Sequence, residues 1–216
     1  DTATTEIYTL ALHDALPSVP RRGLFRIRYT RAMPLELPVE ETRAWLALLR
    51  TPGLGASGVR ELVGRHRSAC AAQASAAREA RVSAEARTWL AAPDAATIDR
   101  DLAWLAAPDH HLIVATSEDF PALLRDASNP PAALFVAGDP ACLWSAQIAI
   151  VGARSASAGR LANARAFARA FAQAGNTVTS GLAEGVDGAA HEGALEGGGK
   201  TIAVLGTGPD LVYPRQ

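Results

Sequence analysis

Hydrophobic positions recur at helical spacing through the first half of the chain. Apolar side chains between residues 40 and 50 fit a short amphipathic helix, which Thr51-Pro52 ends. A second helix, with Ser57 as its expected N-cap, follows a glycine-containing turn, and alanine-rich helix continues from there. The pattern therefore predicts a helical domain over residues 33–108.

Strand patterns dominate the rest of the chain. Short apolar runs predict two strands in a connecting segment, residues 109–145. Strand-type runs at 146–151, 177–180 and 201–205 then alternate with helical spacing, and the first has the continuous apolar character of a buried strand. Such strand–helix–strand units form right-handed parallel crossovers. We expect an α/β fold in which a helical domain precedes an incomplete Rossmann-like parallel sheet, residues 146–216.

Each of these three strands ends in a glycine-containing loop. Ligands of an open parallel sheet bind beyond the carboxyl ends of the strands, where helix N-termini supply N–H groups and partial positive charge. Glycine would let a phosphodiester approach the backbone, and Arg154 could add a bidentate contact. The residues expected to contact a nucleic acid are Gly152, Arg154, Ser155, Ser157, Gly159, Ser180, Gly181, Gly206 and Gly208.

The glycine loops do not match the known nucleotide-binding motifs. Residues 152–159 lack G-x-G-x-x-G, and Gly199-Lys200-Thr201 lacks the earlier glycine of a P-loop and precedes a strand. ATP and NAD are therefore poor candidates, and no cofactor is expected.

Three further loop residues are expected to be structural. Gly185 lies in the second loop, and Asp187 is expected to cap the following helix, with its charge used by backbone N–H groups. His191 has no second histidine or cysteine nearby to form a metal set. We expect it to hydrogen-bond Asp187 or the Ser180 loop, so neither metal binding nor catalysis is expected.

The turn between the first two helices is similar to a helix-hairpin-helix. Gly53 and Gly55 would let the backbone turn with its N–H groups exposed to a DNA phosphate. A tight connection within a small SAM-like helical bundle explains the same spacing. Both interpretations stay open.

Composition excludes several classes of protein. The chain is 49% hydrophobic, and its longest apolar runs are far short of the roughly 20 residues that cross a bilayer. Its two cysteines suggest neither a disulfide framework nor a zinc site, which fits a reducing cytoplasm. A net charge of −1 argues against a globally basic nucleic-acid binder, although a local positive patch would suffice.

The first 32 residues are unlike a protein domain. They resemble translated read-through of a sequencing adapter, and Met33, where a helical pattern starts, is the expected native start. An ordinary leader or a signal segment is the alternative.

Three ordered sequence blocks resemble the DNA-processing protein A (Smf) family. The blocks are V-G-x-R-x-x-S-x-G at 151–159, S-G-L-A-x-G-V-D-x-A-A-H-x-G-A-L at 180–195 and T-I-A-V-L-G-x-G-x-D-x-V-Y-P at 201–214. Segments 119–121 and 130–138 and the helical hairpin are also similar, so the resemblance runs from Met33 to the end of the chain.

The resemblance implies a mediator of natural transformation. Such a protein binds incoming single-stranded DNA, protects it and loads a RecA-type recombinase, as a homodimer and without catalysing a reaction. Arg154 matches the arginine of the family's DNA-binding pocket, and Arg215 stands where members often carry a basic residue. Ala158 replaces the family's usual aromatic residue, and we expect the sheet to be truncated before its remaining strands.

Two other functions remain open at this point. A nucleotide-processing enzyme of the phosphoribohydrolase (lysine-decarboxylase-like) type has similar glycine-ended strands, but residues 206–210 do not match its P-G-G-x-G-T-x-x-E loop. The other is a non-catalytic scaffold in which only the hairpin contacts DNA and Arg154 is an ordinary solvated side chain.

Overall fold

A computed structural model of the chain describes residues 37–79 and 81–206, and it divides them into two compact units. Residues 37–135 belong to the first unit and residues 136–206 to the second. The expectations for residues 1–32, Gly208 and Arg215 lie outside the described residues. Each unit is described by itself.

The described part of the first unit opens with helices, as the spacing predicts. They are α1 (Val39–Leu49), α2 (Gly55–His66), α3 (Ala69–Ala76), α4 (Ala84–Ala91) and α5 (Ala95–Leu105). Side-chain oxygens of Ser68, Ser83 and Asp94 accept N–H groups in the first turns of α3, α4 and α5. Local capping therefore sets where these helices begin.

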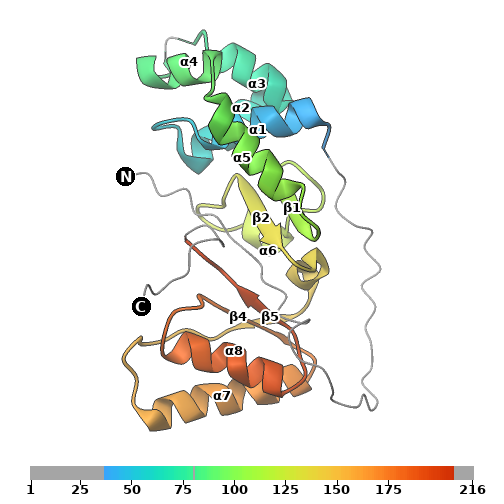
Figure 1. Cartoon of the computed structure of the whole chain (residues 1–216), viewed down its shortest axis with the longest axis vertical. Coiled ribbons are helices and arrows are strands. Elements are labelled where there is room, and N and C mark those ends of the chain that lie inside the picture. The colour runs from blue at the N-terminus through green and yellow to red at the C-terminus, as the bar shows by residue number, and fades with distance from the viewer. Residues whose placement is uncertain (1–36, 80, 207–216) are drawn as a thin grey trace. The chain divides into compact units, whose positions relative to one another are not determined.

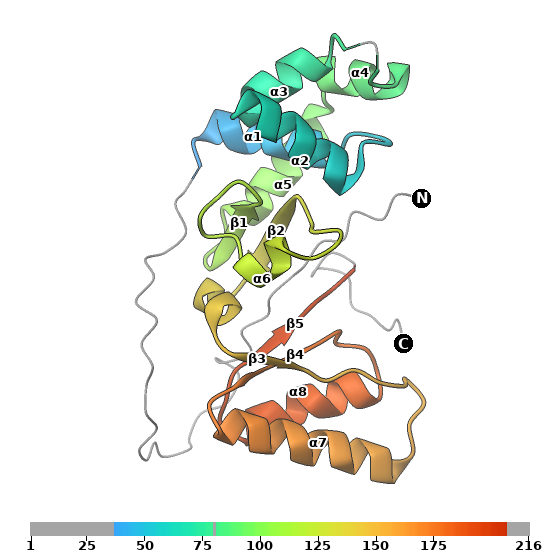
Figure 2. The ribbon, with the colours of Figure 1, turned by 180° about the vertical axis from the view of Figure 1, so that it is seen from behind.

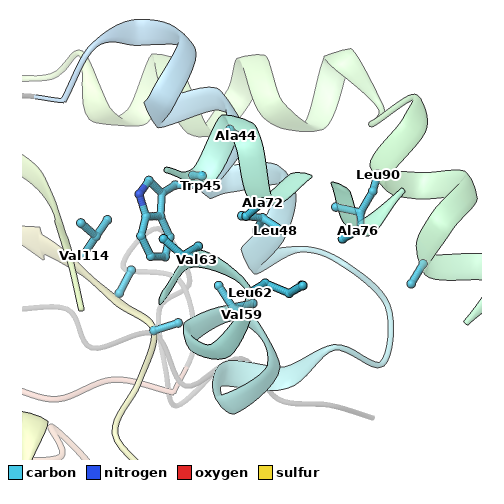
Figure 3. Packing of buried hydrophobic residues seen from close by; sticks show 14 of the residues in the cluster. Ala44, Trp45, Leu48, Val59, Leu62, Val63, Ala72, Ala76, Leu90 and Val114 are labelled. Carbon is cyan, nitrogen blue, oxygen red and sulfur yellow. The ribbon is translucent and has the colours of Figure 1, made fainter. Parts of the chain in front are cut away.

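The hydrophobic core of this unit packs around Trp45 and Leu48 of α1 (Figure 3). Val59, Leu62 and Val63 of α2 join them, all nearly inaccessible to solvent. The second helix differs from the prediction in its start, because α2 begins at Gly55 with Leu54 as N-cap, and Ser57 lies inside it.

A two-stranded sheet follows the helices. It pairs β1 (His110–Val114) with β2 (Ala133–Ala137), with the short helix α6 (Ala122–Arg125) between them in sequence. All five residues of β2 are buried, and the division between the units falls within this strand. A 3₁₀ helix, η1 (Pro140–Trp144), then begins the second unit's described elements.

The second unit contains the predicted parallel sheet. Its elements are β3 (Gln147–Ala149), α7 (Ala158–Gln173), β4 (Thr177–Ser180), α8 (Val186–Glu196) and β5 (Thr201–Ala203). The strand order is β3-β4-β5, and both pairings are parallel. Figures 1 and 2 show α7 and α8 side by side on one face of this sheet. The α/β fold class with a parallel sheet is therefore confirmed.

Small residues let α7 and α8 approach each other closely. Ala168 and Ala172 of α7 pack with Ala190 and Ala194 of α8. A Cβ atom added to Gly193 of α8 would overlap the backbone carbonyl of α7. These small residues thus hold α7 and α8 in close contact on the sheet.

The first strand is shorter and more exposed than predicted. Gln147 and Ala149 of β3 are exposed, and Val151 just beyond is 73% exposed. Among the described strands β3 lies at an edge of the sheet, whereas Val178 in the central β4 is fully buried. An apolar run reports the composition of a strand but not whether a neighbour covers it, so the expectation of a buried strand at 146–151 was wrong for this structure.

Candidate functional site

Two loops meet at the carboxyl edge of the parallel sheet. We call residues 150–157, after β3, loop A and residues 181–185, after β4, loop B. The Val186 N–H donates to the Ala153 carbonyl at 3.2 Å, and the Ser180 hydroxyl donates to the Ile150 carbonyl at 2.6 Å. These bonds fix the two loops against each other.

Asp187 joins both loops through its two carboxylate oxygens. Oδ1 accepts the Gly152 N–H and Oδ2 accepts the Gly181 N–H, each at 3.2 Å, and the residue is only 7% exposed. Asp187 is not the helix cap that the sequence suggested. Gly185 holds the N-cap position of α8, and Asp187 lies in the first turn, where its carboxylate bonds loop backbone.

The glycines of these loops are required by the packing of the loops themselves. A Cβ at Gly152 would lie 2.8 Å from the Val186 side chain, and one at Gly181 would lie 2.8 Å from Asp187 Oδ2. Gly185 has a φ of 86°, and a Cβ there would overlap the Ala153 carbonyl. We expected Gly152 and Gly181 to let a phosphate approach, but their N–H groups are already bonded to Asp187.

Ser180 and His191 are also internal supports. Ser180 is 3% exposed, and its hydroxyl is used by the Ile150 carbonyl. His191 Nδ1 lies 2.7 Å from Thr201 Oγ1, and the Thr201 hydroxyl donates to the Val178 carbonyl, so Nδ1–H is assigned as the donor to Thr201. The expected partner of His191, Asp187 or the Ser180 loop, is therefore replaced by β5.

The environment of His191 favours its neutral form. Burial lowers the pKa of His191, and the nearby Asp187 charge opposes that shift only in part. Within residues 37–79 and 81–206 there is no group of three or more histidine, cysteine, aspartate or glutamate side chains placed to hold a metal ion.

The outer rim of the site lies where loop A enters α7. We define it by Arg154, Ser155, Ser157, Gly159 and Arg160, all of which are exposed. Ser157 is the N-cap of α7, but its hydroxyl makes no hydrogen bond to the helix, and the first turn contains no acidic residue. The rim therefore presents helix N–H groups, hydroxyls and two guanidinium groups on one short stretch of chain.

Arg160 was not among the residues expected from the sequence. It belongs to the helical pattern, and only the observed start of α7 at Ala158 places it in the first turn. The helix dipole disfavours a cation in the first turn by about 0.3–1 kcal/mol. A bound anion would be stabilised at the same place. By contrast, Arg165 pairs across to Glu192 and Glu196 of α8.

The third glycine loop and the hairpin are less informative. Gly206 is exposed, and nothing lies within 4 Å of where its Cβ would be. Gly53 and Gly55 have φ values of 71° and 63°, as a tight turn between α1 and α2 requires. A phosphate contact at this turn stays a prediction.

A pocket of about 340 Å³ lies beside the turn in the first unit. Its charged lining residues are Arg65, Arg81, Glu61 and Glu79. Glu79 accepts a hydrogen bond from Arg81 at 2.7 Å and lies 3.6 Å from Arg65. Because the arginines are already paired, this pocket is not a strongly positive surface.

No helix of the described residues is both long and apolar enough to cross a membrane.

Comparisons with known proteins agree on one family. Residues 111–216 match the family model described as DNA recombination-mediator protein A. Protein Smf of Escherichia coli (strain K12) is 43% identical over 120 residues, which are 56% of this chain and 32% of that protein. DNA processing protein DprA of Streptococcus pneumoniae (strain ATCC BAA-255 / R6) is 39% identical over 98 residues, 44% of this chain and 34% of that protein. The chain thus spans about a third of the length of these curated relatives.

A solved structure shares the fold. The X-ray structure of DNA processing protein A (DprA) from Streptococcus pneumoniae matches with a TM-score of 0.65 and 24% identity, over 80% of this chain and 60% of that one. The family match includes loop A, loop B and the strand that follows them. Residues 111–216 of the chain are therefore similar to the DNA-processing protein A (Smf) family, and the relatives named Smf and DprA support the same family.

Proposed function

We propose that this chain carries part of the single-stranded DNA site of a recombination mediator. In this role it binds incoming DNA in the cytoplasm during natural transformation, protects it and loads a RecA-type recombinase, as a homodimer when full length and without catalysing a reaction. The proposal is supported by the family match and by relatives named for DNA processing.

The observation that carries the proposal is the exposed N-terminus of α7, where Ser157 makes no side-chain capping hydrogen bond and the first turn contains no acidic residue. Arg154 can form a bidentate, charge-assisted contact with a phosphate, and Ser155 and Ser157 can donate hydroxyls. The first-turn N–H groups of α7 and Arg160 would complete the contact. Gly152, Ser180 and Gly181 instead hold the loops together through hydrogen bonds to Asp187 and Ile150.

Binding through these groups should be independent of base sequence. Every proposed contact is made to phosphate, and phosphate contacts fix a strand without reading it. Single strands of equal length and different sequence should therefore bind with similar affinity. A strong preference for one sequence would mean that base contacts outside the rim dominate.

Charge reversal tests the rim directly. Arg154→Glu should weaken binding of a labelled single strand by roughly tenfold or more, because it replaces an attraction to phosphate by a repulsion. Arg169→Glu is the matched control, since Arg169 is an exposed arginine of α7 that lies roughly 16 Å beyond the first residue of that helix. Equal affinities of Arg154→Glu and the wild type in fluorescence anisotropy would remove the rim from the proposal.

The phosphoribohydrolase alternative makes a different prediction. Such an enzyme would release base from a nucleotide 5′-monophosphate and would show no salt-sensitive binding of single strands. The two assays can be run on one preparation at two salt concentrations. Base release without strand binding would reject the mediator in favour of the enzyme.

Recombinase loading needs its own assay. Assembly of a RecA-type filament on single strands coated with a single-strand-binding protein should be faster in the presence of the chain. Arg154→Glu should lose this acceleration, because loading requires the DNA to be held. Equal assembly rates with and without the wild-type protein would contradict loading.

The hairpin is proposed only as an auxiliary phosphate contact, at Gly53 and Gly55. A double replacement by alanine at these positions should reduce affinity less than Arg154→Glu does, because the neighbouring arginines Arg65 and Arg81 are paired with Glu79. A larger loss than at Arg154 would favour the scaffold in which the hairpin is the DNA site.

A further inference from the structure

The loop N–H groups at the carboxyl edge of the parallel sheet already have an anionic acceptor that belongs to the protein itself. In Rossmann-like sheets the N–H groups of the strand-end loops bind the phosphates of nucleotides. Here the Gly152 N–H of loop A and the Gly181 N–H of loop B both donate to Asp187. A carboxylate is an anionic acceptor of the same kind as a phosphate, so it satisfies the donors that a phosphate would use.

The space in front of loop A is also occupied. The Val186 side chain lies against the Cα of Gly152, where even an added Cβ would come within 2.8 Å. The Val186 N–H is bonded to the Ala153 carbonyl, which holds the start of α8 against loop A. Asp187 itself is 7% exposed, so its oxygens belong to the interior of the edge. A free phosphate would have to displace the Asp187 carboxylate to reach the Gly152 N–H.

The negative charge of Asp187 also disfavours a phosphate at this position. A phosphate brought close to the Asp187 carboxylate would meet a like charge in a partly buried place, where screening by water is weak. On the outer rim the same phosphate meets Arg154 and Arg160 instead. The edge therefore has an inner position closed to anions and an outer position favourable to them.

We propose that Asp187 is a built-in anion that excludes free phosphate and mononucleotides from the glycine loops and leaves the outer rim for a polynucleotide backbone. The exclusion of phosphate concerns the loops alone, whereas binding of a polynucleotide at the rim rests on the proposed function. Asp187 is in this sense a specificity-determining residue. A single phosphate gains little binding free energy at the rim, whereas a strand can place several successive phosphates there.

Removing the carboxylate should turn the loops into a phosphate site. Asp187→Ala leaves the Gly152 and Gly181 N–H groups without their acceptor and opens a gap the size of a carboxylate group. Inorganic phosphate, added at constant ionic strength against chloride, should raise the melting temperature of the variant in a saturable way. The phosphate affinity of the variant should exceed that of the wild type by about tenfold or more.

Two further variants keep the test decisive. Asp187→Asn retains the shape and one acceptor but removes the charge, so it covers the case in which Asp187→Ala does not fold, and it should bind phosphate more tightly than the wild type. Glu184→Ala removes an exposed negative charge from loop B and should leave phosphate affinity unchanged. If Glu184→Ala raised the affinity for inorganic phosphate as much as the Asp187 variants do, the effect would be one of general charge and the proposal would be overturned.

The outcomes separate this inference from the proposed function. If the wild type binds inorganic phosphate with the same affinity as both Asp187 variants, Asp187 does not exclude phosphate from the loops. That result would overturn the proposal whatever the DNA assay shows. A higher affinity for inorganic phosphate in the Asp187 variants alone would support exclusion by Asp187. If the wild type then bound no single strand, the proposed DNA site would be rejected. Phosphate gain in the variants together with rim-dependent strand binding is the expected result.

Discussion

His191 shows how a hydrogen bond can be expected from sequence while its partner is missed. The absence of neighbouring metal-binding residues suggested a hydrogen-bonding role, and the structure has one, with Thr201 of β5. Ten positions of chain separate the two residues, and they meet only because the crossover from α8 returns to the sheet. Spacing along one helix cannot reveal such a contact.

The buried, neutral His191 should make stability depend on pH. Its pKa is lowered in the folded state from the ordinary value of 6.5, so the unfolded chain takes up the proton first as pH falls. Stability should be level above pH 6.5 and should fall below it, by up to about 1.4 kcal/mol per pH unit from this group. In denaturant unfolding, the free energy of unfolding of the wild type should fall more steeply below pH 6.5 than that of His191→Gln. Parallel pH profiles would contradict the assignment.

Gly193 is predicted to be intolerant of any side chain. Its α-carbon lies so close to the Arg165 carbonyl of α7 that a methyl group would push the helices apart. Gly193→Ala should lower the free energy of unfolding by about 1–3 kcal/mol, measured in urea. Gly159→Ala is the control, because it lies in α7 with nothing within 4 Å of its Cβ position, and it should be neutral or stabilising by up to about 1 kcal/mol. The reverse order would contradict the close helix pair.

At the scale of elements, helix α3 depends on a residue from another helix. Glu41 of α1 accepts hydrogen bonds from the Ala69 and Cys70 N–H groups at the start of α3, and the Ser68 hydroxyl donates to it at 3.1 Å. Burial alone would raise the pKa of Glu41, but these hydrogen bonds outweigh it, so the pKa lies below its ordinary value of 4.5. The carboxylate therefore acts as a second cap beside Ser68.

Neutralising this cap should destabilise the first unit. Glu41→Gln should lower the free energy of unfolding at pH 7 by about 1 kcal/mol, a typical capping value. Because the pKa is lowered on folding, this contribution is complete above pH 4.5 and is lost as pH falls through the folded value, so the two proteins should converge in acid. The neighbouring, exposed Glu40→Gln should have little effect. An equal loss for both variants in urea unfolding would argue against the cap.

Element types were more predictable than their surroundings. Periodicity located α1, α7 and α8 and the strand–helix–strand order, because these patterns are local. The exposure of β3 and the start of α2 at Gly55 were missed. The first depends on which strands are neighbours, and the second on a turn closed by the Leu54 N–H to the Thr51 carbonyl.

At the scale of the whole molecule, the three ordered loop blocks of the sequence are sufficient to indicate the family. Glycine-ended strands alone indicate only a general phosphate edge, and the fold decides which groups of that edge are bonded internally and which lie at the surface. Asp187 occupies the inner N–H groups, while Arg154, Ser155 and Ser157 remain at the surface with Arg160 beside them. This division could not be predicted, since loops A and B are about 30 residues apart in sequence and meet only in the folded sheet.

The most direct test of the central claim is the salt dependence of single-strand binding. The logarithm of the binding constant should fall linearly with the logarithm of salt concentration, with a slope of about −0.7 for each phosphate neutralised. Arg154→Ala should make that slope shallower by about 0.7, and Arg169→Ala should leave it unchanged. A slope for Arg154→Ala equal to that of the wild type would contradict a phosphate contact at the start of α7.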